Sequence, residues 1–303
     1  MKKTVKDIGN TPLLRLKIIE EKYHLPFALY AKYEASNPTG SIKDRPAYSI
    51  IQNALKNNQL NENSVIVEAT SGNMGISFAF IAHELNIKCR IYMPQSASIE
   101  RRRKMQEYGA EIVLVDGGMS KAVEEALEYV KNNEHAYYTD QFANPYNPLA
   151  HYENTSREII ESLGSTPDYF FAGVGTGGTL IGNARRFIEN NKNVKIYGIE
   201  PNESPLLSKG EAHPHLIQGI GANFVPKIYD ASLVTEILTV SNMEAYEGAR
   251  ILKREEELFC GITSGANLFG VIKYKDKIKE NSKVVIILPD SGDRYLSVEG
   301  LYE

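Results

Sequence analysis

The chain has 303 residues, of which 42% are hydrophobic and 24% are charged, and its formal net charge is −4. This balance is ordinary for a globular protein with one or two cores, and the negative charge excludes a general electrostatic attraction to nucleic acid. No apolar run approaches the roughly 18 residues that span a bilayer. The two cysteines have no paired spacing and the six histidines are scattered, so we expect a cytoplasmic protein with reduced, buried thiols and no metal site.

The first half of the chain alternates apolar, β-rich runs with helical stretches. A first helix is predicted over residues 46–55. After it we expect strands at 64–68, 89–93, 111–115 and 136–139. The helices expected between them are 76–85, 99–108 and 121–132. Strands that alternate with helices pair in parallel, with helices on both faces of the sheet.

A turn-rich segment at residues 144–148 interrupts this alternation, and we predict a domain hinge there. The elements expected after it are helix 152–163, strand 169–172, helix 180–190, strand 194–199, helix 242–256, a turn at 261–265, helix 266–274 and strand 284–288. The whole pattern predicts an α/β protein with two open, twisted, mostly parallel sheets. Because ligands bind beyond the carboxyl ends of parallel strands, the loops after strands are the places to look for chemistry.

One such loop, residues 173–179, follows the strand 169–172 and is rich in glycine and threonine. Glycines allow backbone N–H groups to approach an anion, and the helix that follows adds its dipole, so the loop is suited to a phosphate. It also satisfies G-x-G-x-x-G, with Glu200 closing the next strand. Taken alone, the loop therefore leaves two readings open, a dinucleotide site and a tight turn without a ligand.

A second loop, Thr70-Ser71-Gly72-Asn73-Met74-Gly75, also lies between a strand and a helix. Its hydroxyls, amide and backbone N–H groups converge at a helix start, which suits a carboxylate. The alternative is a simple helix cap by Ser71 or Asn73.

A lysine, Lys43, stands at the predicted start of the helix 46–55. The positive end of a helix dipole disfavours a cation there, and the same field lowers the pKa of a lysine and makes it a better nucleophile toward an aldehyde. The alternative is an exposed lysine paired with Asp44 or Glu34. A phosphate loop, a carboxylate loop and such a lysine together match the needs of pyridoxal-phosphate (PLP) chemistry on an amino acid.

These three segments, residues 37–45, 70–73 and 175–179, resemble motifs of the cysteine synthase/cystathionine β-synthase family of fold-type II PLP enzymes. Further segments are similar to the family in the same order, from about residue 8 to residue 298, and they include residues 218–222 and 288–296. The resemblance implies that G-x-G-x-x-G is fortuitous here, because the family uses this loop for the PLP phosphate.

By this resemblance, Lys43 is the catalytic residue, which forms the Schiff base and moves the Cα proton. Asn73 would meet the phenolic oxygen of the cofactor, the loop would hold its phosphate, and Thr263 would meet the pyridine nitrogen. The implied cofactor-binding residues are Lys43, Asn73, Gly175, Thr176, Gly177, Gly178, Thr179 and Thr263. The implied substrate-binding residues are Thr70, Ser71, Asn73, Met74, Gln141 and Gly219.

The resemblance implies β-replacement on a serine-derived amino acid through an α-aminoacrylate, with O-acetylserine and sulfide giving cysteine. An alternative uses L-cysteine as donor, releases hydrogen sulfide and gives serine, lanthionine or cystathionine. A third hypothesis, of another class, is an NAD-dependent oxidoreductase. Met74 replaces a common threonine and Ala97 a larger residue, and these departures leave the substrate pair open.

The resemblance also implies an architecture similar to the tryptophan synthase β subunit, with PLP in the cleft between two domains. We expect an N-terminal substrate-loop domain at 37–147, with a mobile part at about 83–131. Residues 1–36 and 148–303 would form the larger, phosphate-binding domain. A homodimer is expected, and neither nucleic acid nor a membrane is expected as a partner.

Overall fold

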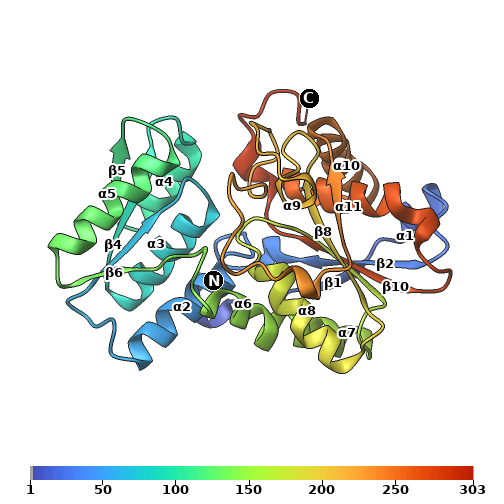
Figure 1. Ribbon diagram of the computed structural model, residues 1–303, viewed down its shortest axis with the longest axis horizontal. Helices are drawn as coiled ribbons and strands as arrows, with labels where there is room; N and C mark the ends of the chain where they lie inside the picture. Colours follow the sequence, from blue (N-terminus) through green and yellow to red (C-terminus); the bar gives the residue numbers. More distant parts are fainter. Residues whose placement is uncertain (1–2, 303) are drawn as a thin grey trace. The chain divides into compact units, whose positions relative to one another are not determined.

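The computed structural model describes residues 3–302, and the chain divides into two compact units (Figure 1). The smaller unit contains residues up to Ile8 and Lys43–Asn147, and the larger contains Gly9–Ile42 and the residues from Pro148 onward. Each unit has its own sheet, as the sequence predicts for an α/β protein with two mostly parallel sheets. The domain ranges expected from the sequence differ from these units at residues 3–8 and 37–42, and those ranges stay a prediction.

The smaller unit is built on four parallel strands in the order β5-β4-β3-β6. The strands are β3 (Val65–Ala69), β4 (Lys88–Pro94), β5 (Glu111–Val115) and β6 (Ala136–Tyr138). The helices are α2 (Asp44–Lys56), α3 (Asn73–Leu85), α4 (Ile99–Glu107) and α5 (Met119–Asn132). Both faces of this sheet are buried: Ile66 and Ile91 pack with α2 and α3, whereas Val67 and Ala69 pack with Ala122 and Ala126 of α5.

The larger unit has six strands in the order β1-β2-β10-β7-β8-β9. They are β1 (Leu13–Arg15), β2 (Ala28–Tyr33), β7 (Tyr169–Gly173), β8 (Lys195–Pro201), β9 (Glu236–Val240) and β10 (Lys283–Leu288). β1 runs antiparallel to β2, and the other neighbours are parallel. The helices are α1 (Lys17–Lys22), α7 (Ser156–Leu163), α8 (Gly178–Asn190), α9 (Leu206–Lys209), α10 (Asn242–Glu256) and α11 (Ile262–Tyr274).

The position of strand β10 in the sheet explains why its sequence is continuously apolar. It lies between β2 and β7, and its alternate residues enter different cores. Val284, Ile286 and Leu288 pack in one hydrophobic cluster, whereas Val285 and Ile287 pack in the other. A central parallel strand covered on both faces has no position for a solvated side chain, so the alternation of an edge strand is absent.

The segment predicted as a hinge is largely helical. α6 (Tyr146–Ala150) continues directly into a π-helix, His151–Thr155, and then into α7. The prediction of a turn at 144–148 was therefore wrong beyond Asn144 and Pro145, because Pro148 lies early in a helix, where its missing N–H costs no hydrogen bond.

Besides α6, the sequence reading missed five helices and strands, β1, α1, β2, α9 and β9, which are short or carry polar residues in their runs. Both cysteines are free and buried, as predicted. Within residues 3–302, no helix is long and apolar enough to cross a membrane.

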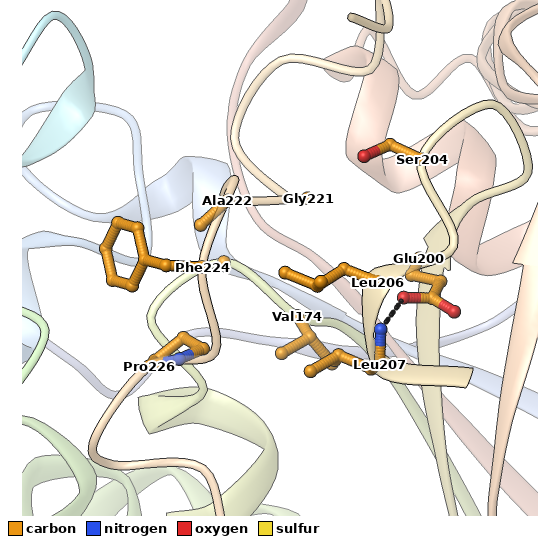
Figure 2. Close-up of a pocket in the computed structure, with 10 residues that line it drawn as sticks. Val174, Glu200, Ser204, Leu206, Leu207, Gly221, Ala222, Phe224 and Pro226 are labelled. Atoms are coloured by element: carbon orange, nitrogen blue, oxygen red, sulfur yellow. Dashed lines mark hydrogen bonds between the residues drawn. The ribbon is translucent and has the colours of Figure 1, made fainter. Parts of the chain in front are cut away.

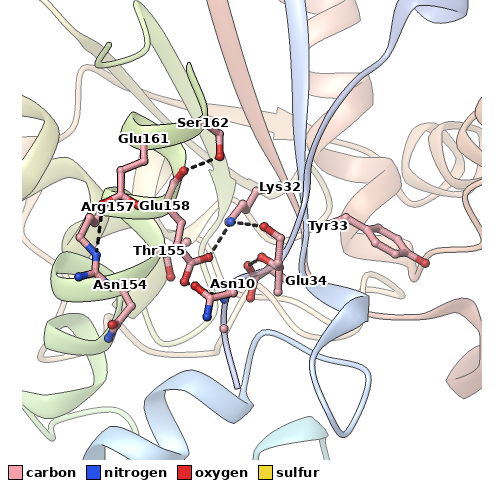
Figure 3. Close-up of polar contacts among 12 residues, drawn as sticks. Asn10, Lys32, Tyr33, Glu34, Asn154, Thr155, Arg157, Glu158, Glu161 and Ser162 are labelled. Carbon is pink, nitrogen blue, oxygen red and sulfur yellow. Dashed lines mark hydrogen bonds and ion pairs between the residues drawn. The ribbon is translucent and has the colours of Figure 1, made fainter. Parts of the chain in front are cut away.

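A buried ion pair joins distant parts of the larger unit. Lys32 of β2 is fully buried, and its Nζ lies 2.7 Å from Glu158 Oε2 of α7 and 2.6 Å from the carbonyl oxygen of Thr11 (Figure 3). The other oxygen of Glu158 accepts a hydrogen bond from the backbone N–H of Asn10 at 3.0 Å. Glu34 accepts from the Thr11 hydroxyl and from the Asn37 amide, so the network ties the segments at residues 10–11 and 34–37 to α7.

Replacing Lys32 with methionine should destabilise the protein, because it leaves the Glu158 carboxylate buried without its cation. Breaking a buried pair in this way costs about 3–5 kcal/mol. The measurement is urea unfolding followed by circular dichroism. The matched control is Lys22→Met, whose ammonium is exposed and whose partner Glu255 keeps a second cation, Arg254, so the unfolding midpoint should change little. Equal effects of the two substitutions would contradict the role given to Lys32.

Candidate active site

Lys43 lies directly before α2, and its carbonyl oxygen accepts a hydrogen bond from the backbone N–H of Ala47 at 3.1 Å. The helix begins at Asp44, two residues earlier than predicted, so Pro46 is its third residue and not its first. Proline is tolerated there because first-turn N–H groups have no intrahelical acceptor. The Asp44 carboxylate accepts a hydrogen bond of 2.6 Å from Ser77 Oγ of α3, which ties the start of α2 to α3.

The Thr70–Gly75 loop is the start of α3. The helix begins at Asn73, three residues before the predicted start, and Thr70 Oγ1 accepts a hydrogen bond from Gly72 N–H at 3.2 Å. The N–H groups of Asn73 and Met74 are therefore first-turn donors, which a carboxylate can accept from. The Met74 side chain is 1% exposed and belongs to the hydrophobic core of the smaller unit, so its substitution for threonine acts on packing.

Gln141 is tied to this loop through Glu68, a residue that sequence reasoning missed. Glu68 Oε2 accepts hydrogen bonds from Thr139 Oγ1 at 2.6 Å and from Gln141 N–H at 3.2 Å, and Glu68 Oε1 accepts from Ala69 N–H. Burial raises the pKa of the Glu68 carboxyl group to about 7, although these hydrogen bonds oppose the rise. A signal was available in the sequence: a carboxylate near the end of an apolar strand, immediately before a loop of small polar residues.

In the larger unit, the loop after β7 is shaped by glycines. A Cβ on Gly175 would lie 2.4 Å from the carbonyl oxygen of Gly219, and Gly177 has a φ of +85°. α8 then begins at Gly178, two residues before the predicted start. The backbone can thus come close to a ligand at the positive end of the helix, where first-turn N–H groups have no intrahelical acceptor, and this fits a phosphate.

Threonine hydroxyls of this loop are fixed by neighbours. Thr176 Oγ1 accepts a hydrogen bond from Gly178 N–H at 3.3 Å, and Thr179 Oγ1 lies 3.3 Å from His151 Nε2. The other ring nitrogen of His151, Nδ1, lies 3.0 Å from Thr155 Oγ1 within the π-helix. Such bulged turns recur at functional sites.

Thr263 lies in the first turn of α11, where the sequence reading expected a turn at 261–265. That expectation was wrong, because α11 starts at Ile262 and its first residues are too small and polar to show helical periodicity. Thr263 Oγ1 donates to the carbonyl oxygen of Gln218 at 2.9 Å, beside Gly219, whose φ is +100°. The structure therefore brings Thr263, Gly219 and the Gly175 loop together.

The chain before Lys43 is held by the C-terminal segment. Ile42 N–H donates to Pro289 O at 2.7 Å, Ser291 N–H donates to Gly40 O at 3.1 Å, and the Arg294 guanidinium donates to Thr39 O. Two of the motifs quoted above, 37–45 and 288–296, are thus neighbours along residues 39–42.

Glu200, the acidic residue of the possible dinucleotide motif, has another task. Its carboxylate accepts from the N–H groups of Leu207 and Ser208 at 2.7 and 3.0 Å and so caps α9. It lines a small pocket of the larger unit, where the close-up shows the bond to Leu207 (Figure 2). The other lining residues are Val174, Gly175, Ser204, Leu206, Leu207, Gly221, Ala222, Phe224 and Pro226. A carboxylate occupied in this way is not available to a ribose.

The sequence-predicted site residues form two groups. Lys43, Thr70, Ser71, Asn73, Met74 and Gln141 belong to the smaller unit, whereas residues 175–179, Gly219 and Thr263 belong to the larger. Most of these residues lie at or next to helix starts, whereas Gln141 and Gly219 lie in turns. These features define a parallel α/β enzyme with anion-binding loops at its strand ends and a lysine at a helix start.

Comparison with known proteins gives this class a family. The model of the family "Pyridoxal-phosphate dependent enzyme" matches residues 5–290. Cysteine synthase B of Campylobacter jejuni is 42% identical over 294 residues, 96% of each chain. A hydrogen sulfide-producing enzyme from Fusobacterium nucleatum has a TM-score of 0.93 and 40% identity, over 98% of this chain and 100% of that one. The O-acetylserine dependent cystathionine β-synthase of Helicobacter pylori has a TM-score of 0.93 and 34% identity, over 100% and 99%.

The chain therefore belongs to the cysteine synthase family of pyridoxal-phosphate dependent enzymes. The family, the fold class and the cofactor expected from the sequence are confirmed. The reading of G-x-G-x-x-G as a dinucleotide site is not needed, since Glu200 caps α9 and the family uses PLP.

Gly175→Ala should weaken cofactor binding, because the added Cβ would overlap the Gly219 carbonyl and push the loop away from the phosphate. We expect the PLP dissociation constant of the apoprotein to rise at least about tenfold, the loss of one or two hydrogen bonds to a charged group. The measurement is fluorescence titration with PLP. Gly118→Ala is the control, since nothing lies within 4 Å of a Cβ there, and it should bind PLP normally.

Glu68 should leave a pH signature in stability. A carboxyl group whose pKa rises from 4.5 to about 7 on folding contributes stability below pH 4.5 and loses it as the pH rises to 7. The unfolding free energy of Glu68→Gln, relative to the natural protein, should therefore increase between pH 5 and pH 8. The measurement is urea unfolding of both proteins at each pH. A difference that stays constant across this range would show that Glu68 has an ordinary pKa.

Proposed function

We propose that this protein is a PLP-dependent β-replacing enzyme of the cysteine synthase type, with O-acetylserine and sulfide as substrates and cysteine as product. The observation that carries the proposal is the position of Lys43, directly before α2 and tied through Asp44 and Ser77 to α3. A lysine there stands at the positive end of a helix, which favours its neutral, nucleophilic form.

Lys43 Nζ would hold the cofactor covalently, and residues Gly175, Thr176, Gly177, Gly178 and Thr179 would hold its phosphate. Asn73 would donate to its phenolic oxygen. Bound PLP supplies the electron sink that weakens the Cα–H bond and the bond to the β-leaving group. Thr263 would meet the pyridine nitrogen with a neutral hydroxyl, turned from its bond to the Gln218 carbonyl oxygen. A neutral donor leaves that nitrogen unprotonated and favours fast loss of the β-substituent.

The substrate carboxylate would be bound by Thr70, Ser71, Asn73, Met74 and Gln141. Gly219 would also contact the substrate. Met74 can contribute through its backbone N–H, since its side chain is in the core. The neutral amine of Lys43, once released by the incoming amino acid, would take the Cα proton and later return it. Acetate leaves Cβ, and hydrosulfide adds there, so the net change is O-acetylserine plus hydrogen sulfide to cysteine plus acetic acid.

A second donor, L-cysteine, is supported by the likeness to the hydrogen sulfide-producing enzyme of F. nucleatum. Hydrogen sulfide would then leave, and water, a second cysteine or homocysteine would add, giving serine, lanthionine or cystathionine. The reaction class is the same, and the leaving group and nucleophile differ.

We further propose that the enzyme is cytoplasmic and a homodimer. The N-terminal substrate-loop domain would comprise residues 37–147, with a mobile part at about 83–131. Residues 1–36 and 148–303 would form the larger, phosphate-binding domain. The family membership supports these proposals, and small-angle scattering with and without substrate would test the dimer and the movement.

Product analysis of the purified holoenzyme decides between the donors. We expect cysteine from O-acetylserine and sulfide, and little sulfide release from L-cysteine alone. Fast sulfide release from L-cysteine would establish the second donor instead, and no turnover with either would refute the proposed function. Lys43→Ala should lose the cofactor's visible absorbance and turnover, whereas the exposed-lysine control Lys121→Ala should keep both.

A further inference from the structure

We propose that Glu68 is a positioning residue for amino-acid binding: its carboxyl group fixes the main chain of Gln141 beside the Thr70–Gly75 loop, and its protonation state sets how firmly. The inference rests on the proposed function, since Gln141 is there assigned to the substrate. Glu68 itself is 1% exposed, so it would act through the residues it holds.

The position of Glu68 is unusual for a carboxylate. Its strand, β3, is the second from the edge of the sheet, and its register partner on β4 is Ile91. Its face of the sheet is otherwise a hydrophobic cluster that contains Ile66, Ile91 and Cys89. Among residues 3–302, no lysine or arginine forms an ion pair with it, so its charge is stabilised by hydrogen bonds alone. A group that costs stability in this way is retained for specific contacts.

Those contacts link the two chain segments assigned to the substrate carboxylate. Oε1 accepts from Ala69 N–H, one residue before Thr70. Oε2 accepts from Gln141 N–H, directly after the chain turns at Asp140, whose φ is +46°. The carbonyl oxygen of Gln141 in turn accepts from the Asn147 amide at 2.8 Å, so both backbone polar groups of Gln141 are held.

Thr139 allows Glu68 to gain or lose a proton without leaving a polar atom unpaired. Its hydroxyl oxygen lies 2.6 Å from Glu68 Oε2 and 3.2 Å from the carbonyl oxygen of Val67. When Glu68 is ionised, the hydroxyl donates to the carboxylate. When Glu68 is protonated, the hydroxyl can turn to donate to Val67 and accept the Glu68 proton, because a hydroxyl group both donates and accepts.

The two states hold Gln141 differently. A carboxylate is a stronger acceptor than a neutral carboxylic acid, so the Gln141 N–H bond is tighter in the ionised state. The other titratable groups near Glu68 are Asp140, Cys89 and Tyr138. Asp140 repels the carboxylate, and burial raises the pKa of the Cys89 thiol and of the Tyr138 hydroxyl, so both stay neutral near pH 7. Protonation near neutral pH, consistent with a Glu68 pKa of about 7, would then loosen Gln141 as the pH falls.

Glu68→Gln tests this in the PLP-loaded enzyme. The amide cannot accept at both Ala69 and Gln141, because one end of the side chain is now a donor. We expect KM for the amino-acid donor to rise about five- to tenfold at pH 8 with kcat within about twofold. This is the size of one ordinary hydrogen bond, because Glu68 acts on the substrate only through Gln141. The ratio of the two KM values should shrink toward pH 6, where Glu68 is also neutral. The control Glu111→Gln makes the same change at an exposed carboxylate of the same sheet and should match the natural enzyme.

Amide hydrogen exchange of the peptide that contains residues 139–143 gives a readout without turnover. It should be faster in Glu68→Gln and unchanged in Glu111→Gln. Thr139→Val should show the same changes to a smaller degree, and Thr139→Ser should restore natural behaviour, so the proposal remains testable if Glu68→Gln does not fold.

An unchanged KM ratio, a ratio independent of pH, or unchanged exchange would each overturn the positioning role. Loss of kcat at constant KM would also overturn it. If the natural enzyme turns over no donor, the proposed function fails, and hydrogen exchange still decides whether Glu68 fixes Gln141.

Discussion

Both units depend on one constraint: the backbone N–H groups at the start of each helix must find a hydrogen-bond acceptor outside the helix. The first-turn N–H groups of a helix have no intrahelical acceptor, so a helix start needs a cap, water or a ligand. α3 and α8 present glycine, serine, threonine and asparagine at these positions, with few bulky side chains in the way. A carboxylate and a phosphate are the natural complements of such starts, and the PLP chemistry of an amino acid brings both.

The same constraint explains where reading the sequence succeeded and where it failed. Strand β5 and helix α10 lie at the predicted residues, because an apolar pattern marks the strand and a capping box marks the helix start. Four helices that carry site residues, α2, α3, α8 and α11, begin two to four residues earlier than predicted. Their first turns contain the glycines and polar residues that we propose bind ligands, and these residues carry no hydrophobic periodicity. Function therefore hides the helix start from a search for amphipathic patterns.

Other features could not be predicted because they depend on contacts distant in sequence. Lys32 lies in a strand that was missed, and its partner Glu158 is 126 residues away. Glu200 looked like a ribose-binding residue, and its role as a cap of α9 follows from an irregular segment whose path no local pattern reveals. The site residues themselves were recognised through family motifs, whereas Glu68 interacts with Thr139 and Gln141, which lie more than 70 residues further along.

The contact between residues 39–42 and the C-terminal segment has an evolutionary consequence. Thr39 and Gly40 are bonded through their backbones to Arg294 and Ser291, and a Cβ on Gly40 would lie 3.4 Å from the Arg294 guanidinium. Two stretches separated by about 250 residues therefore share one steric environment. Substitutions in the two stretches should therefore covary among relatives. A chimera that exchanges one stretch without the other should have poorly fitting contacts at residues 39–42, next to Lys43.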